Sequence, residues 1–308
     1  MSGYTQGTTY SIKYNHVNQI VRSNEIDSIL RVIDESMSQY VNNSLISRIN
    51  NGEDIQLDSL IHLVLERSIE ICHETDGMFD VTVSPLVDDW GFGPNKNGIK
   101  KTFSTLSANG SVYYIGCDQI YLKNEKIIKS DSVLIDLDGI AQGFSVDYVS
   151  RYLESIGLND FMVEIGGELR CKGDNMGKKW KIGIDNPNNK REHFVFILQL
   201  EDVALATSGS YRNYYYLDSI KISHTMNPKT LLPASNNLIS ATILHKDCMS
   251  ADAYATACMS FGLEDSKRFL SENGIDGALI YIENEDTLYY FTSSFLSFLH
   301  RSPGSAPQ

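Results

Sequence analysis

Residues 133–157 read VLIDLDGIAQGFSVDYVSRYLESIG, and this stretch predicts a strand that is followed directly by a helix. Its first five residues are a short apolar run typical of a buried strand, and Gly139 and Gly143 indicate a turn. Apolar residues then recur at helical spacing up to Ile156, and Gly157 follows as a candidate C-terminal cap. The stretch therefore predicts a strand, a glycine-bearing turn and a helix in immediate succession.

In the rest of the chain, the predicted strands and helices are mixed without strict alternation. Upstream, residues 8–14 predict a strand, and residues 26–37 and 60–71 predict helices. Downstream, strands are expected at residues 161–165, 179–184, 194–200, 203–206, 220–224 and 238–244 and in a hairpin at 278–291, with helices at 250–259 and 265–272. A doubly wound parallel sheet needs regular alternation, so the sequence predicts an α+β fold with mixed, largely antiparallel sheets and packed helices.

The composition is that of an acidic globular protein. The 308 residues are 42% hydrophobic and 21% charged, with a formal net charge of -13 and a sequence pI near 4.9. No basic stripe is visible, which argues against a nucleic-acid binder. If the ligand is an anionic phosphate, so acidic a protein needs a cation to bridge to it.

The cysteines and the chain ends bear on the cellular compartment. The five cysteines, at positions 72, 117, 171, 248 and 258, form no CxxC pair, so we expect reduced, buried thiols rather than a disulfide framework or a zinc site. No stretch reaches the ~18 apolar residues of a membrane helix. The chain enters a strand-like run almost directly after Gly3, which suggests an exported protein whose leader is absent here. Residues 301–308 are expected to be a disordered tail.

The segment S-A-D-A-Y-A-T at residues 250–256 is a candidate metal site. Asp252 and Thr256 are four residues apart and share one face of the helix predicted there. A carboxylate and a hydroxyl are hard oxygen ligands, which suit Mg²⁺ or Ca²⁺ and suit zinc poorly. The alternative is that Asp252 caps the helix or faces water in its first turn.

Two glycine-bearing segments are candidates for holding a cofactor. Residues 135–143, I-D-L-D-G-I-A-Q-G, stand at the strand-to-helix junction, where free backbone N–H groups commonly bind phosphate. The alternative is a tight turn capped by Asp136. Residues 75–93 predict two glycine-rich turns around an alternating strand with aromatic residues at each end. Those side chains either form the wall of a site for a flat ring system or simply pack in the core.

His224 is the candidate for proton transfer. It follows a predicted strand and precedes the turn T-M-N-P-K-T-L-L-P at residues 225–233. Histidine is the side chain best suited to exchange a proton near neutral pH. The alternative is a hydrogen-bonded structural residue in a β-rich region.

Six segments, in this order, resemble the ApbE-like FAD:protein FMN transferase family. They are D-G-M-F-D-V-T-V-S-P-L-V-D-D-W-G-F-G, I-D-L-D-G-I-A-Q-G, V-E-I-G-G-E-L-R, A-T-S-G-S-Y-R-N-Y-Y, S-H-T-M-N-P and A-D-A-Y-A-T. The resemblance covers nearly the whole chain, from Gly7 to Leu299. It implies a T-fold-like core and a single flavin transferase domain over residues 1–300, with two intertwined lobes as an alternative organisation.

The resemblance implies a specific activity. Members of this family bind FAD, cleave its pyrophosphate with Mg²⁺ and attach FMN through a phosphoester bond to Thr or Ser of a target protein, releasing AMP. The implied acceptor is a subunit of a membrane redox complex. The implied location is the periplasm or the outer face of the cytoplasmic membrane, with a lipid anchor on the native form. Two other functions stay open, an FAD pyrophosphatase that yields FMN and AMP and a non-catalytic FAD-binding protein.

The resemblance also assigns roles to particular residues. It implies that Asp252, Thr256 and the backbone carbonyl of Gly139 hold the metal, with a further backbone oxygen from Ala255. His224 is the implied base for the target hydroxyl. The implied FAD contacts are Gln6, Tyr40, Met78, Phe79, Asp80, Asp136, Gln142 and Met226.

Four positions depart from the family pattern. Gln6 stands where Met is usual, and Gln142 stands where Lys or Glu is common. Asn227 replaces the Asp of H-T-x-D-P, and Leu231 replaces the Gly that normally precedes the final turn. None of the four removes an implied metal ligand or His224.

Overall fold

A central antiparallel sheet organises the computed structural model, which describes residues 1–16, 20–94, 114–187, 194–211, 213–217 and 220–300. Its strand order is β1-β2-β5-β6-β9-β14-β15-β16, and every neighbouring pair is antiparallel. The strands are β1 (Ser2–Thr5), β2 (Thr8–Tyr14), β5 (Phe161–Ile165), β6 (Glu168–Lys172), β9 (Val203–Gly209), β14 (Leu238–His245), β15 (Asp276–Glu283) and β16 (Asp286–Phe291). The predicted α+β class with largely antiparallel sheets is confirmed.

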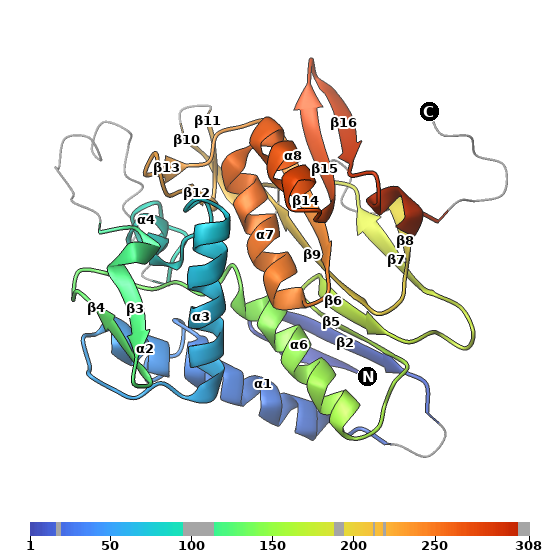
Figure 1. Cartoon of the computed structure of the whole chain (residues 1–308), viewed down its shortest axis with the longest axis horizontal. Helices are drawn as coiled ribbons and strands as arrows, with labels where there is room; N and C mark the ends of the chain where they lie inside the picture. The colour runs from blue at the N-terminus through green and yellow to red at the C-terminus, as the bar shows by residue number, and fades with distance from the viewer. Residues whose placement is uncertain (17–19, 95–113, 188–193, 212, 218–219, 301–308) are drawn as a thin grey trace.

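Helices cover one face of this sheet (Figure 1). α6 (Ala141–Ser155) packs on β5 and β6, and α7 (Cys248–Phe261) packs on β9 and β14. α1 (Ser23–Met37) packs on α6, while α3 (Ser59–Glu74) and α8 (Leu263–Glu272) pack on α7. The helices therefore form a layer in which α6 and α7 lie directly on the sheet.

A hairpin covers the opposite face. It consists of β7 (Trp180–Asp185) and β8 (Phe194–Leu200). In β5, Phe161 and Val163 join the apolar cluster under the helices, whereas Met162 joins the cluster under the hairpin. In β14, Ile243 and Leu244 divide between the two sides in the same way. Because side chains alternate along a strand, the sheet is buried on both faces.

Short elements complete the architecture. The helices are α2 (Leu45–Asn50) and α4 (Ser84–Asp89), and the 3-10 turns are η1 (Val81–Val83), η2 (Cys117–Gln119) and η3 (Phe295–Phe298). The small hairpins are β3 (Ile120–Lys123) with β4 (Lys126–Lys129), β10 (Tyr214–Leu217) with β11 (Ile220–Ser223), and β12 (Met226–Asn227) with β13 (Leu232–Pro233).

Helices α3 and α7 begin at capping aspartates, and α6 is followed by a glycine. Asp58 accepts hydrogen bonds from two backbone N–H groups in the first turn of α3, and Asp247 accepts one from the Ser250 N–H in the first turn of α7. Gly157 follows α6 with φ of +88°, which confirms the predicted C-terminal cap, because glycine adopts this left-handed conformation without steric cost.

The strand predicted at residues 133–137 is wrong. The segment is largely buried but pairs with no strand of the described structure. Ile135 exchanges two hydrogen bonds with the Asn50 side chain, at 2.9 and 2.8 Å. The Asp136 N–H donates to the Val81 carbonyl at 2.7 Å. A side chain and a neighbouring turn thus satisfy the backbone groups that a strand partner was expected to satisfy.

The strand predicted within residues 75–93 is also wrong. The Asp80 carboxylate accepts hydrogen bonds from the Thr82 N–H and hydroxyl, at 2.8 and 2.6 Å, and this starts the turn η1. Pro85 then stands in the first turn of α4, where its missing N–H is not needed. These two local preferences outweigh the alternating pattern.

The expectation of five reduced cysteines is wrong for one pair. Cys72, in the last turn of α3, and Cys117, in η2, form a disulfide with a Cα–Cα distance of 6.4 Å. The remaining cysteines, Cys171, Cys248 and Cys258, are free and buried, as predicted. Folding brings the first two together across 45 residues of sequence, which no local spacing indicates.

The sequence also predicts a disordered C-terminal tail and no membrane-spanning helix. The predicted tail at residues 301–308 lies outside the described residues. Within the part of the chain that the structure describes, no helix is both long enough and apolar enough to cross a bilayer.

Candidate active site

A cavity of about 300 Å³ lies between the start of α6, the middle of α7 and the segment that follows α3. The end of β9 and the turn after β11 complete its walls. The predicted site residues that line it are Tyr40, Met78, Phe79, Asp80, Asp136, Gly139, Gln142, His224, Met226, Asp252 and Thr256. One cavity thus contains residues predicted for the metal, for the flavin and for the base.

Asp252 and Thr256 project from one face of α7 into this cavity, as their spacing predicts. One oxygen of the buried Asp252 carboxylate accepts a hydrogen bond from the Gly143 N–H at 3.0 Å. The Thr256 hydroxyl lies 3.3 Å from the Ser208 hydroxyl. A Cβ placed on Gly139 would lie 3.3 Å from the Thr256 Oγ1, so the Gly139 backbone is next to that hydroxyl.

The charge in this cavity is negative. Asp136 and Asp252 are buried, and Asp138 is exposed where it lines the cavity. Burial raises the pKa of Asp136 and of Asp252, and the nearby Asp138 carboxylate raises both further. No Lys or Arg is among the described residues of the lining. Buried carboxylate and hydroxyl oxygens without a cationic side chain are a donor set that fits a divalent metal.

His224 is held in one tautomer by the backbone. Its Nδ1 lies 3.1 Å from the carbonyl oxygen of Asn213. A carbonyl can only accept, so Nδ1 carries the proton and Nε2 of the neutral ring keeps its lone pair. Burial lowers the pKa of His224 below its usual value, although the Asn213 carbonyl acts in the opposite direction. The ring is therefore neutral, with a free basic nitrogen, at physiological pH.

Apolar side chains form the rest of the wall. Met78, Phe79 and Met226 are buried and line the cavity, and Phe79 also belongs to the main core. Phe92 meets the His224 ring edge-on, with 6.2 Å between ring centroids. These groups give the cavity the mixed apolar and polar lining that is typical of small-molecule sites.

A second cavity of about 610 Å³ adjoins the first. Both are lined by Tyr40, Asp138 and Gln142. The Tyr40 hydroxyl donates to the Asp138 carboxylate at 3.3 Å, and the Tyr40 ring is exposed. Gln6 lies in this second cavity, where its side chain donates to the Ser145 hydroxyl at 2.9 Å. The two cavities together form a longer site than either one alone.

A model of the ApbE family matches residues 6–279 of the chain. A relative from Vibrio cholerae serotype O1, called FAD:protein FMN transferase, is 36% identical over 98% of this chain and 92% of the relative. The chain belongs to the ApbE family. A relative with the same description from Haemophilus influenzae is 35% identical over 91% of this chain and 85% of the relative.

Solved structures of ApbE proteins have the same fold. The flavin transferase ApbE from Vibrio cholerae superimposes with a TM-score of 0.87 at 36% identity, over 97% of this chain and 98% of that one. The apo form of the Pseudomonas stutzeri flavinyl transferase ApbE also has a TM-score of 0.87, at 28% identity, over 98% of this chain and 96% of that one.

Two departures from the ApbE pattern have structural explanations. Asn227 donates from its amide to the Ser260 carbonyl at 3.3 Å, which an Asp cannot do, and its oxygen accepts from two backbone N–H groups of the following turn. Leu231 has φ of +59°, a conformation that favours glycine, which is the residue the pattern expects there.

A third departure from the family pattern, Gln142, packs against the backbone of Gly166. Its amide donates to the Ile165 carbonyl at 3.0 Å. A Cβ on the neighbouring Gly166 would come within 1.7 Å of the Gln142 amide nitrogen, so only glycine leaves room for this side chain. Gln142 therefore sits in a fixed position on the wall that the two cavities share.

One implied ligand is not among the residues that line the cavity. Ala255 is completely buried within α7 and is not part of the lining of the cavity. Residues that sequence reasoning passed over do reach it, among them Asp138 and Ser208. Both lie inside segments already singled out, I-D-L-D-G and A-T-S-G, so polar residues within those motifs were the available signal.

Proposed function

We propose that this chain cleaves FAD with the help of Mg²⁺ and transfers the FMN half to a Thr or Ser hydroxyl of an acceptor protein, releasing AMP. Membership of the ApbE family supports a transferase that acts on FAD. The observation that carries the proposal is that one cavity joins the Asp252 and Thr256 face to a neutral His224. Cleavage of a pyrophosphate and activation of a hydroxyl need those two groups together.

In the proposed reaction, the acceptor hydroxyl oxygen attacks the phosphorus on the FMN side of the pyrophosphate. A new P–O bond joins FMN to the acceptor, the bond to the bridging oxygen breaks, and that oxygen leaves with AMP. The acceptor proton passes to Nε2 of His224, the ring nitrogen that the contact with Asn213 leaves unprotonated. Thr and Ser hydroxyls are weak nucleophiles, so a positioned base is required.

The proposed metal ligands are the Asp252 carboxylate, the Thr256 hydroxyl and the Gly139 carbonyl. When bound there, Mg²⁺ would neutralise the charge of the pyrophosphate. The hydrogen bond from Gly143 orients Asp252, and Ser208 orients Thr256, so both side chains are held before any ligand arrives. The same oxygen donors also accept Ca²⁺, which is the alternative ion.

The proposed acceptor is a subunit of a membrane redox complex, and the proposed location is the periplasm or the outer face of the cytoplasmic membrane. The Cys72–Cys117 disulfide supports that location, because disulfides persist in oxidising compartments and are rare in the cytosol.

A fluorescence assay tests transfer. The protein, FAD and Mg²⁺ are incubated with membranes from cells that lack a flavin transferase, and a denaturing gel is read for covalent flavin. We expect a fluorescent acceptor band and release of AMP. Release of FMN and AMP without a labelled band would instead identify a pyrophosphatase, and binding of FAD without cleavage would identify a flavin-binding protein.

The metal assignment is tested with a variant of similar shape. Asp252→Asn keeps an oxygen for the Gly143 N–H and removes the charge, so we expect it to abolish both Mg²⁺ binding and FAD cleavage. Thr256→Val should weaken both less severely, because it removes a neutral ligand. Calorimetric titration with Mg²⁺ measures the first effect independently of activity, and unchanged Mg²⁺ affinity in Asp252→Asn would refute the assignment.

A further inference from the structure

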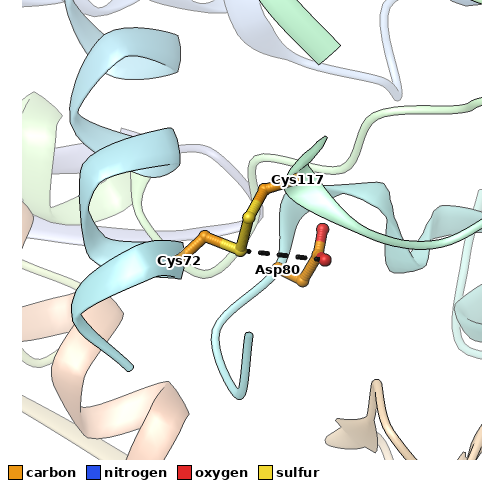
Figure 2. Close-up of side chains that lie close together, drawn as sticks. All are labelled: Cys72, Asp80 and Cys117. Carbon is orange, nitrogen blue, oxygen red and sulfur yellow. Dashed lines mark hydrogen bonds between the residues drawn. A yellow bond between two sulfur atoms is a disulfide. The ribbon is translucent and has the colours of Figure 1, made fainter. Parts of the chain in front are cut away.

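The Cys72–Cys117 disulfide lies directly against a residue of the candidate active site. Figure 2 shows both cysteines beside Asp80, with 3.9 Å between the Cys72 Sγ and an oxygen of the Asp80 carboxylate. A disulfide sulfur has no proton, so in the oxidised protein this is a contact and not a hydrogen bond. Asp80 is buried and lines the smaller cavity, next to Met78 and Phe79.

Hydrogen bonds hold the Asp80 carboxylate in place next to the disulfide. Thr82 donates from its N–H and its hydroxyl to one carboxylate oxygen. The backbone of Cys117 lies close enough to lower the pKa of the Asp80 carboxyl, although burial raises that pKa more. The Gly116 N–H donates to the Thr82 hydroxyl at 2.8 Å, which ties the same two segments together a second time.

Met78 and Phe79, which we call the flavin wall, are attached to the end of α3 near Cys72. The Gly77 N–H donates to the Cys72 carbonyl at 2.7 Å, and the Phe79 N–H donates to the Thr75 hydroxyl at 3.1 Å. The disulfide thus connects the end of α3, from which the segment with Met78 and Phe79 starts, to η2, which directly follows the Gly116 donor to Thr82. The disulfide is therefore a covalent link between α3 and η2.

We propose that the Cys72–Cys117 disulfide is a positioning device for Asp80 and the flavin wall, so that its reduction weakens FAD binding. This inference rests on the proposed function, in which FAD occupies the cavity. Reduction by a dithiol breaks the S–S bond, adds one electron and one proton to each sulfur, and converts the dithiol into its own disulfide. The segment that carries the Gly116 N–H is then no longer covalently tied to α3.

Reduction also changes the surroundings of the Asp80 carboxylate. The new Cys72 thiol is placed to donate weakly to the oxygen that it already contacts. The Thr82 hydroxyl that donates to the carboxylate then depends on a Gly116 N–H that the disulfide no longer holds, and the Cys72 thiol adds a weak donor to the other carboxylate oxygen. Both cysteines are buried, whereas the side chains next to them in sequence, His73 and Asp118, are exposed.

The test compares FAD affinity in the oxidised and dithiol-reduced wild-type protein, without added metal so that no turnover occurs. We expect the dissociation constant for FAD to rise about tenfold on reduction, the scale of one hydrogen bond to a charged group. Removing the dithiol and reoxidising should restore the original affinity. Equal affinities in the two states would overturn the inference, even if the reduced protein melts at a lower temperature.

Two variants separate positioning from general thiol effects. Cys72→Ala/Cys117→Ala should bind FAD as weakly as the reduced wild type and should not respond to the dithiol. Cys171→Ala removes a buried free thiol elsewhere and should keep the full response. If the double variant does not fold, Thr82→Val tests the same support in the oxidised protein and should weaken FAD binding.

The outcomes distinguish this inference from the proposed function. An oxidised protein that binds and transfers flavin, and that does so equally well when reduced, contradicts the inference alone. An oxidised protein that does not bind FAD contradicts the proposed function, and the inference falls with it.

Discussion

His224 illustrates how a single backbone contact can assign a chemical role. The Asn213 carbonyl selects the tautomer with the proton on Nδ1, and burial keeps the ring neutral. Phe92 lies in an edge-on arrangement with the same ring. The side chain is therefore prepared to accept a proton at Nε2, and not to donate one.

Replacement of His224 should separate transfer from binding. His224→Ala should leave FAD affinity nearly unchanged and slow flavin transfer by roughly 10²–10⁴-fold, the usual contribution of a general base. The matched control is His62→Ala, on α3 and outside the cavity lining, which should transfer at the wild-type rate. A His224→Ala protein that loses FAD affinity in proportion to its rate would make His224 a binding residue instead.

The pH dependence of transfer follows from the same residue. A base acts in its deprotonated form, and the pKa of His224 is lowered below 6.5 in the folded protein. The rate at saturating FAD and Mg²⁺ should therefore stay constant through neutral pH and fall only below pH 6.5. Metal must be saturating at every pH, because acid also protonates Asp252, whose pKa is raised by burial in the metal-free protein. A fall that begins well above pH 6.5 would contradict the assignment.

Leu231 stores backbone strain that glycine would relieve. Its φ of +59° brings a Cβ into conflict with the backbone, and its side chain is partly exposed. Leu231→Gly should raise the free energy of unfolding by roughly 0.5–1 kcal/mol, after allowing for the extra freedom of glycine in the unfolded chain. The neighbouring Leu232→Gly, in β13 and without a positive φ, should lower it. Thermal or denaturant unfolding of the two variants measures the difference.

Helices α6 and α7 hold the proposed metal ligand Asp252 through hydrogen bonds in both directions. The Gly143 N–H of α6 donates to Asp252 of α7, and the Met249 N–H of α7 donates to Asp147 of α6 at 2.9 Å. A Cβ on Gly143 would lie 2.4 Å from the Cys248 carbonyl oxygen, so the two helices can approach this closely only at a glycine. The close approach brings the Gly143 N–H, in the first turn of α6, to Asp252.

Gly143→Ala should push these helices apart. We expect the free energy of unfolding to fall by roughly 1–3 kcal/mol, typical of overpacking, together with a loss of Mg²⁺ affinity because Asp252 shifts. Ser155→Ala, an exposed change in the same helix, should alter neither property. Calorimetry with Mg²⁺ and urea unfolding measure the two effects, and a Gly143→Ala protein with wild-type Mg²⁺ affinity would show that the contact does not orient Asp252.

Across the whole molecule, the site lies on the helical side of a doubly covered sheet. Its residues come from the turn after α1, the end of β9 and the middle of α7, which the sheet and its helices hold in fixed positions. Two adjoining cavities share Tyr40, Asp138 and Gln142. A long ligand such as FAD can extend through both only by passing these three residues.

Tyr40 should therefore affect FAD binding strongly. Tyr40→Ala should weaken FAD binding by roughly 1–3 kcal/mol, the value for losing the contacts of a large side chain. Tyr289→Ala, an exposed tyrosine of β16 outside both cavities, is the matched control and should bind FAD like the wild type. Calorimetric titration with FAD compares them, and wild-type affinity in Tyr40→Ala would mean that the ligand does not pass between the cavities.

The sequence alone determined the features that depend on neighbours along the chain. The periodicity of α1 and α3 predicted both helices, because apolar residues on one face can be recognised at a spacing of three and four. The Asp252 and Thr256 pair followed from the same spacing, and the order of six motifs indicated the family. His224 was identified only as a candidate, since its tautomer depends on a contact with Asn213.

Tertiary structure decided the features whose partners are distant in sequence. Residues 133–137 are apolar and short enough for a strand, but Asn50 and Val81 satisfy their backbone groups. The Cys72–Cys117 disulfide and its contact with Asp80 depend on how α3 and η2 meet. Local sequence does not predict such long-range contacts, because a hydrogen-bonding or apolar group can pair with many partners. Only the packing of the whole chain determines which partner it has.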